Sequence, residues 1–116
     1  MPGSMLTSGD VMNADLGVPI GSEAGFPHPV IVVSAQAVLD QSPSVVQVVP
    51  LTSTLNNVAT ELRIDPNGSG LTTASSAQCQ HLRSISATRL SDVRGNVGPV
   101  DLSRIREVIA LLLDIG

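Results

Sequence analysis

One histidine stands in a setting that suits acid–base chemistry. His28 lies between Pro27 and Pro29, which fix φ on both sides, so a stiff and extended backbone carries the imidazole. Glu23 belongs to the same loop, Gly21–Pro29, which is rich in turn-forming residues. Histidine, with an ordinary pKa of about 6.5, is the side chain best matched to proton transfer near neutral pH. The loop therefore indicates a candidate acid or base, although a turn that ends in an exposed histidine would give the same pattern.

Three hydroxyl side chains follow a predicted buried strand. Thr52, Ser53 and Thr54 come directly after the apolar run Val45–Leu51. Thr52 and Ser53 could donate hydrogen bonds to a phosphate or an oxyanion, and Arg83 could add positive charge. Sequence spacing does not show that these groups meet in space, and solvated residues at the rim of the fold would be spaced in the same way.

Cys79 and His81 form the other pair of reactive side chains. They lie two apart on a predicted strand and would therefore share one face of it. A metal site needs more than two ligands, and a Cys–His nucleophilic pair needs a third group to orient the base. We therefore predict no metal site and no cofactor, and we interpret the pair as packing residues. A phosphate-binding loop of the form G-x-x-x-x-G-K-[ST] is excluded because the chain has no lysine.

The apolar segments predict a small, strongly bent sheet that would position these groups. Alternation over Val11–Leu16 and apolar runs at Val30–Ser34 and Val45–Leu51 indicate strands. Val30–Val33 is apolar on both faces, which is typical of a central strand. Pro50 cannot donate a hydrogen bond, so pairing on its side of the strand is expected to lapse there. Further strands are expected at Val58–Ile64 and Val93–Val97, and Ser75–Ile85 is expected to form one or two short strands.

A helix is predicted at the C-terminal end. Pro99 suits the first helical turn, and Asp101 suits the positive end of the helix dipole. An apolar stripe at helical spacing comprises Leu102, Ile105, Val108, Ile109, Leu112 and Leu113. We expect this stripe to pack on the sheet, which gives a mainly β fold with helices, of the α+β class.

Length and composition restrict the class of protein further. A chain of 116 residues fits one domain, assigned to residues 9–116, with residues 1–8 as a leader or disordered N-terminus. Phe26 is the only aromatic residue, so the core is expected to be aliphatic. One cysteine excludes an internal disulfide and fits a reducing cytoplasm, and no apolar run is long enough to span a membrane.

The charge balance argues against a nucleic-acid footprint that covers the whole domain. Ten acids face six arginines, for a net charge of −4. A local patch of arginines could still bind RNA, and Arg83, Arg89 and Arg94 are close enough in sequence to form one.

Several motifs, taken in order, resemble those of the MazF/PemK toxins. They are Gly9-Asp10-Val11, Asp15-Leu16-Gly17, Gly21-Ser22-Glu23, His28–Ser34, Val48–Ser53 and Ala77–Ile85. The closing helix also falls where that family has one, so the resemblance covers nearly the whole chain. It implies an SH3-like, strongly bent β-barrel, of the kind shared by MazF, PemK and CcdB, with the C-terminal helix packed on it.

The resemblance also implies a function. Members of the family are toxins of type II toxin–antitoxin systems, which inhibit growth as homodimeric, metal-independent, sequence-specific endoribonucleases that cut single-stranded mRNA. The ribose 2′-hydroxyl attacks the adjacent phosphate and leaves a cyclic phosphate and a free 5′-hydroxyl. The implied partners are a second copy of the chain and a cognate MazE-like antitoxin, of which an extended acidic or apolar segment would lie across the dimer.

In that family an arginine before the loop proline and a threonine after the core strand carry the catalysis. Thr52 matches the threonine, and His28 stands where the arginine would be, so His28 is interpreted as a functional substitute. The residues expected to bind RNA or to support this pair are Glu23, Ser53, Gln80 and Arg83.

Two further positions depart from the family pattern, and they keep alternative functions open. Ser8 stands where a basic residue is usual, and Met12 stands where an aromatic is usual. One alternative is a degenerate toxin that keeps dimerisation and antitoxin binding but cuts RNA poorly. The other is a gyrase poison built on the related barrel, although Asp114-Ile115-Gly116 lacks the aromatic that such toxins use.

Overall fold

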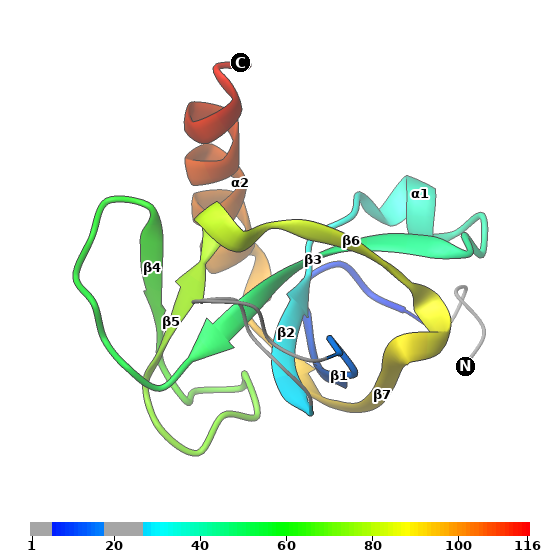
Figure 1. The fold of residues 1–116 in the computed structure, drawn as a ribbon, viewed down its shortest axis with the longest axis horizontal. Coiled ribbons are helices and arrows are strands. Elements are labelled where there is room, and N and C mark those ends of the chain that lie inside the picture. The colour runs from blue at the N-terminus through cyan, green and yellow to red at the C-terminus, as the bar shows by residue number, and fades with distance from the viewer. Residues whose placement is uncertain (1–5, 18–26) are drawn as a thin grey trace.

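The computed structural model describes residues 6–17 and 27–116 as a strongly bent antiparallel sheet from which one helix projects (Figure 1). The strands in these ranges are β1 (Asp10–Ala14), β2 (His28–Val32), β3 (Val45–Thr52), β4 (Glu61–Ile64), β5 (Ser75–Gln78), β6 (Arg83–Ser86) and β7 (Leu90–Asn96). The helical elements are α1 (Gln36–Leu39), the 3₁₀ turns η2 (Cys79–His81) and η3 (Ala87–Arg89), and α2 (Gly98–Leu113). The predicted mainly β fold with a C-terminal helix is confirmed.

Strand β3 joins the two parts of the sheet. The strands follow the order β4-β5-β3-β2-β1-β7, and β6 also pairs with β3. Residues Val45–Val48 pair with β6, whereas Leu51 and Thr52 pair with β5. Pro50, which has no N–H to donate, lies in the gap between these two pairings. The predicted lapse of pairing on one side is therefore confirmed, although the strand itself continues to Thr52.

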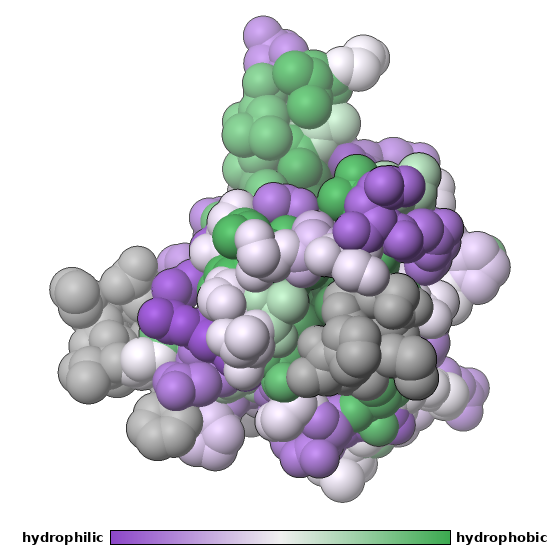
Figure 2. All heavy atoms as spheres, turned by 90° about the vertical axis from the view of Figure 1, so that its right-hand side faces the viewer, coloured by the Kyte–Doolittle hydropathy of each residue, from purple (hydrophilic) through white to green (hydrophobic). Residues whose placement is uncertain are grey.

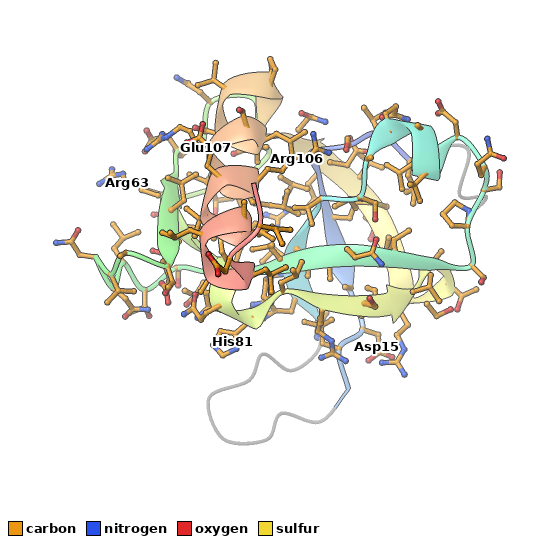
Figure 3. All side chains as sticks on the ribbon, turned by 90° about the horizontal axis from the view of Figure 1, so that it is seen from above. Asp15, Arg63, His81, Arg106 and Glu107 are labelled. Atoms are coloured by element: carbon orange, nitrogen blue, oxygen red, sulfur yellow. The ribbon has the colours of Figure 1, made fainter. Side chains whose placement is uncertain are left out.

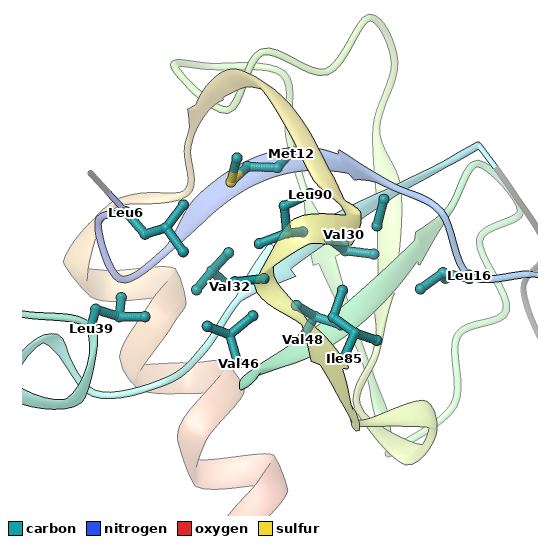
Figure 4. Close-up of a cluster of buried hydrophobic side chains, with 12 residues drawn as sticks. Leu6, Met12, Leu16, Val30, Val32, Leu39, Val46, Val48, Ile85 and Leu90 are labelled. Atoms are coloured by element: carbon teal, nitrogen blue, oxygen red, sulfur yellow. The ribbon is translucent and has the colours of Figure 1, made fainter. Parts of the chain in front are cut away.

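The central strands bury both of their faces, which confirms β2 as a central strand. One face supplies an inner cluster inside the bend of the sheet (Figure 4). The members of the inner cluster are Leu6, Met12, Ala14, Leu16, Val30, Val32, Leu39, Val46, Val48, Ile85, Ala87 and Leu90. The opposite face supplies an outer cluster beneath α2, formed by Val11, Ile31, Val33, Val49, Leu51, Leu62, Ile64, Leu71, Ala77, Cys79, Leu102 and Ile105. Successive residues of β2 and β3 thus belong to alternate clusters, as the period of a strand requires.

Only the first half of α2 packs on the sheet. Leu102 and Ile105 are buried, and the next turn is partly buried. The expectation that the apolar stripe packs as far as Leu113 is wrong, because the helix projects beyond the sheet: Leu112 is 41% exposed and Leu113 is 56% exposed. Figure 2 shows hydrophobic side chains gathered on this projecting end, at the top of the view. No helix in residues 6–17 and 27–116 combines the length and the apolar character that crossing a membrane requires.

One predicted strand is shorter than expected. Strand β4 begins at Glu61, and Val58 is exposed because the preceding loop turns at Asn57, whose φ is +52°. The stretch Ser75–Ile85 forms two short strands, as one of the two expectations had it, and η2 lies between them where the chain turns from β5 to β6. Cys79 and His81 therefore lie in a 3₁₀ turn and do not share the face of a strand.

The residues just before β1 belong to the domain, which corrects the boundary placed at residue 9. Leu6 is buried in the inner cluster, and the Ser8 N–H donates to Gln36 Oε1 at 2.9 Å. The Ser8 hydroxyl donates to the carbonyl of Ser34 and accepts from Arg106 Nη2 at 2.7 Å. Arg106, labelled in Figure 3, thus ties α2 to the N-terminal segment.

Candidate active site

A pocket of about 260 Å³ opens where β3 ends. Its walls are His28, Pro29, Leu51, Thr52, Ser53, Leu71, Thr72, Thr73, Ser75 and Arg94. The structure thus brings together three of the site residues expected from the sequence, namely His28, Thr52 and Ser53.

The pairing of β2 with β3 explains why His28 and Thr52 are neighbours. The two strands are antiparallel, and Val30 lies opposite Pro50. When this register is continued by two residues, His28 lies opposite Thr52. On its other side His28 pairs with Ala14 of β1, so strands on both sides fix its backbone.

The imidazole of His28 is held in one tautomer. Its Nε2 lies within hydrogen-bond distance of the Leu51 carbonyl oxygen. A carbonyl can only accept, so Nε2 carries the hydrogen and Nδ1 of a neutral ring keeps its lone pair. Burial disfavours the charged imidazolium and lowers the pKa of His28 below 6.5, and the bond to Leu51 opposes this shift. The ring is therefore neutral at neutral pH and can act as a base through Nδ1.

Thr52 is arranged to donate a hydrogen bond into the pocket. Its Oγ1 accepts a hydrogen bond of 3.2 Å from the backbone N–H of Thr54. An oxygen that already accepts from the protein keeps its own O–H hydrogen for a ligand. Thr52 therefore suits an anionic or phosphoryl oxygen.

Arg94 lines the same pocket, and sequence reasoning did not include it in the site. Arg94 reaches the pocket because the backbone of β7 lies directly against the backbone of the loop that precedes Leu71. A Cβ added to Gly70, whose φ is +78°, would lie 2.1 Å from the carbonyl oxygen of Arg94. A Cβ added to Gly95 would lie 2.4 Å from the carbonyl carbon of Ser69. Gly70 and Gly95 are the sequence signal for a close approach of two backbones, but they do not reveal which segments approach each other.

Two of the remaining site residues expected from the sequence, Gln80 and Arg83, do not line this pocket. Gln80 is exposed, and its Nε2 donates to Glu61 Oε2 at 2.6 Å. Arg83 lies at the start of β6, opposite Val48. Glu23 lies outside the residues that the structure describes.

Cys79 is poorly suited to nucleophilic chemistry. It is buried in the outer cluster, and burial raises the pKa of its thiol to about 11. The reactive form of cysteine is the thiolate, which a raised pKa suppresses. Within the described ranges, no three side chains among His, Cys, Asp and Glu are grouped so that they could hold a metal ion.

The pocket and the bent sheet around it can be compared with known proteins. A family model described as "PemK-like, MazF-like toxin of type II toxin-antitoxin system" matches residues 7–113. The chain belongs to the PemK/MazF toxin family. One relative in this family, endoribonuclease MazF9 of Mycobacterium tuberculosis, is 32% identical over 96% of this chain and 98% of its own length.

Solved structures of PemK/MazF proteins confirm the predicted barrel with its C-terminal helix. MazF from Deinococcus radiodurans superposes with a TM-score of 0.76 at 22% identity, over 93% of this chain and 96% of that chain. An endoribonuclease from Mycobacterial species, in complex with its cognate antitoxin, has a TM-score of 0.73 at 24% identity. That likeness covers 93% of this chain and 94% of the other.

Proposed function

We propose that this PemK/MazF chain is the toxin of a type II toxin–antitoxin pair and acts as an endoribonuclease on single-stranded mRNA. The observation that carries the proposal is the pocket in which a neutral, tautomerically fixed His28 lies beside Thr52. The relative named endoribonuclease MazF9 supports the same activity. The reaction we propose requires no metal ion.

In the proposed reaction His28 is the general base. Its Nδ1 takes the proton of the ribose 2′-hydroxyl, and the 2′-oxygen forms a bond to the adjacent phosphorus. The bond from phosphorus to the 5′-oxygen breaks, and that oxygen takes a proton from solvent. The products are a 2′,3′-cyclic phosphate and a free 5′-hydroxyl. His28 then releases to solvent the proton that it took, which restores the neutral ring. A positioned base of this kind contributes roughly 10²- to 10⁴-fold to a rate.

Thr52 and Ser53 are proposed to hold the phosphate. The hydroxyl of Thr52 has its hydrogen available for a ligand, because its oxygen already accepts from Thr54. A donor aimed at a non-bridging oxygen stabilises the charge that develops there in the transition state. Gln80 and Arg83 remain proposed RNA-binding or supporting residues, at positions other than this pocket. Glu23 remains a proposed supporting residue and lies outside the described residues.

We further propose a cytoplasmic homodimer that binds an extended antitoxin segment. The exposed apolar end of α2 supports self-association, since Leu111 and Ile115 are 77% and 62% exposed. An apolar pocket of about 230 Å³ adjoins this end, between α2 and the sheet. A structural relative was solved with its cognate antitoxin, which supports an antitoxin as the partner here. Light scattering should give a dimer at micromolar concentration, and Leu111→Asp should shift it towards a monomer.

A cleavage assay with matched variants tests the proposed activity. A long single-stranded transcript is incubated with protein in the presence of EDTA, and new ends are tested for a 5′-hydroxyl and a cyclic phosphate. We expect the wild type to cut at defined sequences, His28→Ala to be inactive and Thr52→Ala to lose most of the rate. His81→Ala is the control, because it removes the other histidine from a 3₁₀ turn that does not line the pocket.

The same assay identifies the degenerate alternative. If the wild type is silent and only His28→Arg cuts, position 28 has lost its function and the base assigned to His28 is wrong. If His28→Ala cuts as fast as the wild type, the pocket is not the site of cleavage.

A further inference from the structure

The pocket contains a positive charge that does not come from position 28. A neutral imidazole cannot balance a phosphate, so a phosphate in this pocket needs another cation close by. We propose that the guanidinium of Arg94, presented by β7, binds the scissile phosphate and supplies the charge that an arginine at position 28 would otherwise provide. This inference rests on the proposed function and assigns the residue that grips its substrate.

Few cations in this chain could serve the pocket. The chain has no lysine, and its arginines are Arg63, Arg83, Arg89, Arg94, Arg104 and Arg106. Arg63 pairs with Asp65 at 3.0 Å, and Arg104 pairs with Asp101 at 3.2 Å. Of the six arginines, all of which lie in the described ranges, Arg94 is the one that lines the pocket with His28 and Thr52.

Arg106 is committed elsewhere. Its Nη2 donates to the hydroxyl of Ser8 and lies 3.2 Å from the carbonyl oxygen of Val33. Figure 3 shows Arg63 beside β4 and Arg106 beside α2. The Arg106 guanidinium links α2 to the N-terminal segment, and neither arginine lines the pocket.

Arg94 is suited to an anion because its charge is uncompensated within the protein. Among the described residues, no carboxylate oxygen lies within 4.0 Å of its guanidinium. The guanidinium offers several N–H donors in one plane, and it can hold two phosphate oxygens at once, which an imidazole cannot do. In a protein of net charge −4, such a local cation is needed to draw a polyanion to this face.

The backbone of β7 at Arg94 is held in place by its contacts with the loop that precedes Leu71. The N–H of Asn96 donates to the carbonyl of Gly68 at 3.0 Å, so β7 is bonded to the loop that leads to Leu71 and Thr72. Gly70 and Gly95 allow the two backbones to touch. The same loop therefore supplies one wall of the pocket and anchors the strand that carries the cation. In the proposed site His28 on β2 is the base and Arg94 on β7 is the cation, whereas a single arginine at position 28 would serve as both.

The first test measures binding without cleavage. The probe is a mixed-sequence 2′-O-methyl oligoribonucleotide, which lacks the attacking hydroxyl. Its affinity is measured against salt concentration for the wild type, Arg94→Gln and Arg104→Gln. Each phosphate contact to a single strand adds about 0.7 to the slope of log affinity against log salt. We expect Arg94→Gln to lower the slope by about 0.7, and Arg104→Gln to leave it unchanged despite the same loss of charge.

The second test measures single-turnover cleavage by the same proteins and by Arg94→Lys. Loss of one donor to the developing charge should slow Arg94→Gln by roughly 10²- to 10³-fold. Arg94→Lys should recover part of the rate, because lysine keeps the charge but not the planar fork. The inflection in the pH–rate profile should stay where it is in the wild type, because the base is unchanged.

The two proposals fail in different ways. A silent wild type whose salt slope still drops in Arg94→Gln overturns the nuclease and keeps Arg94 as the phosphate contact. An active wild type that Arg94→Gln matches in both slope and rate overturns the assignment of Arg94 and leaves the nuclease standing. A drop in rate with no change in slope likewise excludes a phosphate contact.

Discussion

The packing of α2 gives a prediction whose size follows from burial. Ile105 is fully buried in the outer cluster, between the helix and the central strands. Ile105→Ala removes three carbon groups, which at about 0.8 kcal/mol each gives about 2.4 kcal/mol of lost transfer free energy. The residual cavity adds to this, so the loss in the free energy of unfolding should fall within about 2–5 kcal/mol. The lower half of that range is expected, because α2 lies at the edge of the fold and can move to fill part of the space.

Urea unfolding at fixed protein concentration measures this change. Ile105→Ala should lower the midpoint without changing the slope with urea, since the surface exposed on unfolding stays nearly the same. Ile105→Val should cost about 0.5–1.5 kcal/mol and so fall between the two proteins. Val100→Ala, at an α2 side chain that is 72% exposed and lies away from the end proposed for self-association, is the control and should cost less than about 0.5 kcal/mol. A loss below about 0.5 kcal/mol for Ile105→Ala would refute the packing of α2 on the sheet.

Four further predictions concern the site, its supports and the buried Cys79. Because the pKa of His28 is lowered, the cleavage rate should rise with pH through a value below 6.5 and then level off; a rate that falls over this range would contradict a basic role. The same shift means that the folded protein resists protonation, so stability should drop as pH falls below about 6.5, and His28→Gln should remove that part of the drop. Gly70→Ala should cost more than Gly68→Ala in thermal unfolding and should also slow cleavage, because both have positive φ but only the added methyl at Gly70 meets a backbone atom, at 2.1 Å. Cys79, with a pKa of about 11, should react with iodoacetamide far more slowly in the native protein than in denaturant, and equal rates would exclude its burial.

Local signals in the sequence were sufficient for the regular elements. Helix α2 begins at Gly98 with Pro99 in its first turn, as the residues there predict. The two-sided apolar run at Val30–Val33 correctly indicated a central strand, because a strand that contributes to both clusters needs apolar residues at every position. Where prediction failed, the deciding contacts were distant in sequence. The segment after β5 turns into η2 since β5 and β6 pair with different parts of β3, and no local pattern at Cys79 encodes that change.

The candidate site likewise contains residues that the sequence indicated and features that depend on distant contacts. Family motifs identified His28 and Thr52, and the register of β2 against β3 accounts for their proximity. Arg94 was absent from the expected site because its place depends on a contact between β7 and the loop at Gly70. The tautomer of His28 depends on the Leu51 carbonyl, which lies 23 residues away in the sequence.

Strand β3 has a consequence for how the protein unfolds. It supplies Val46 and Val48 to the inner cluster and Val49 and Leu51 to the outer cluster, and it hydrogen-bonds to strands of both parts of the sheet. Neither part of the sheet can therefore unfold without disrupting the strand that it shares with the other part. We expect the domain to unfold as a single cooperative unit. Thr52 ends this shared strand. If Thr52 holds the phosphate as proposed, cleavage depends on the integrity of both cores, and substitutions far from the pocket, in either cluster, should alter activity through the same strand.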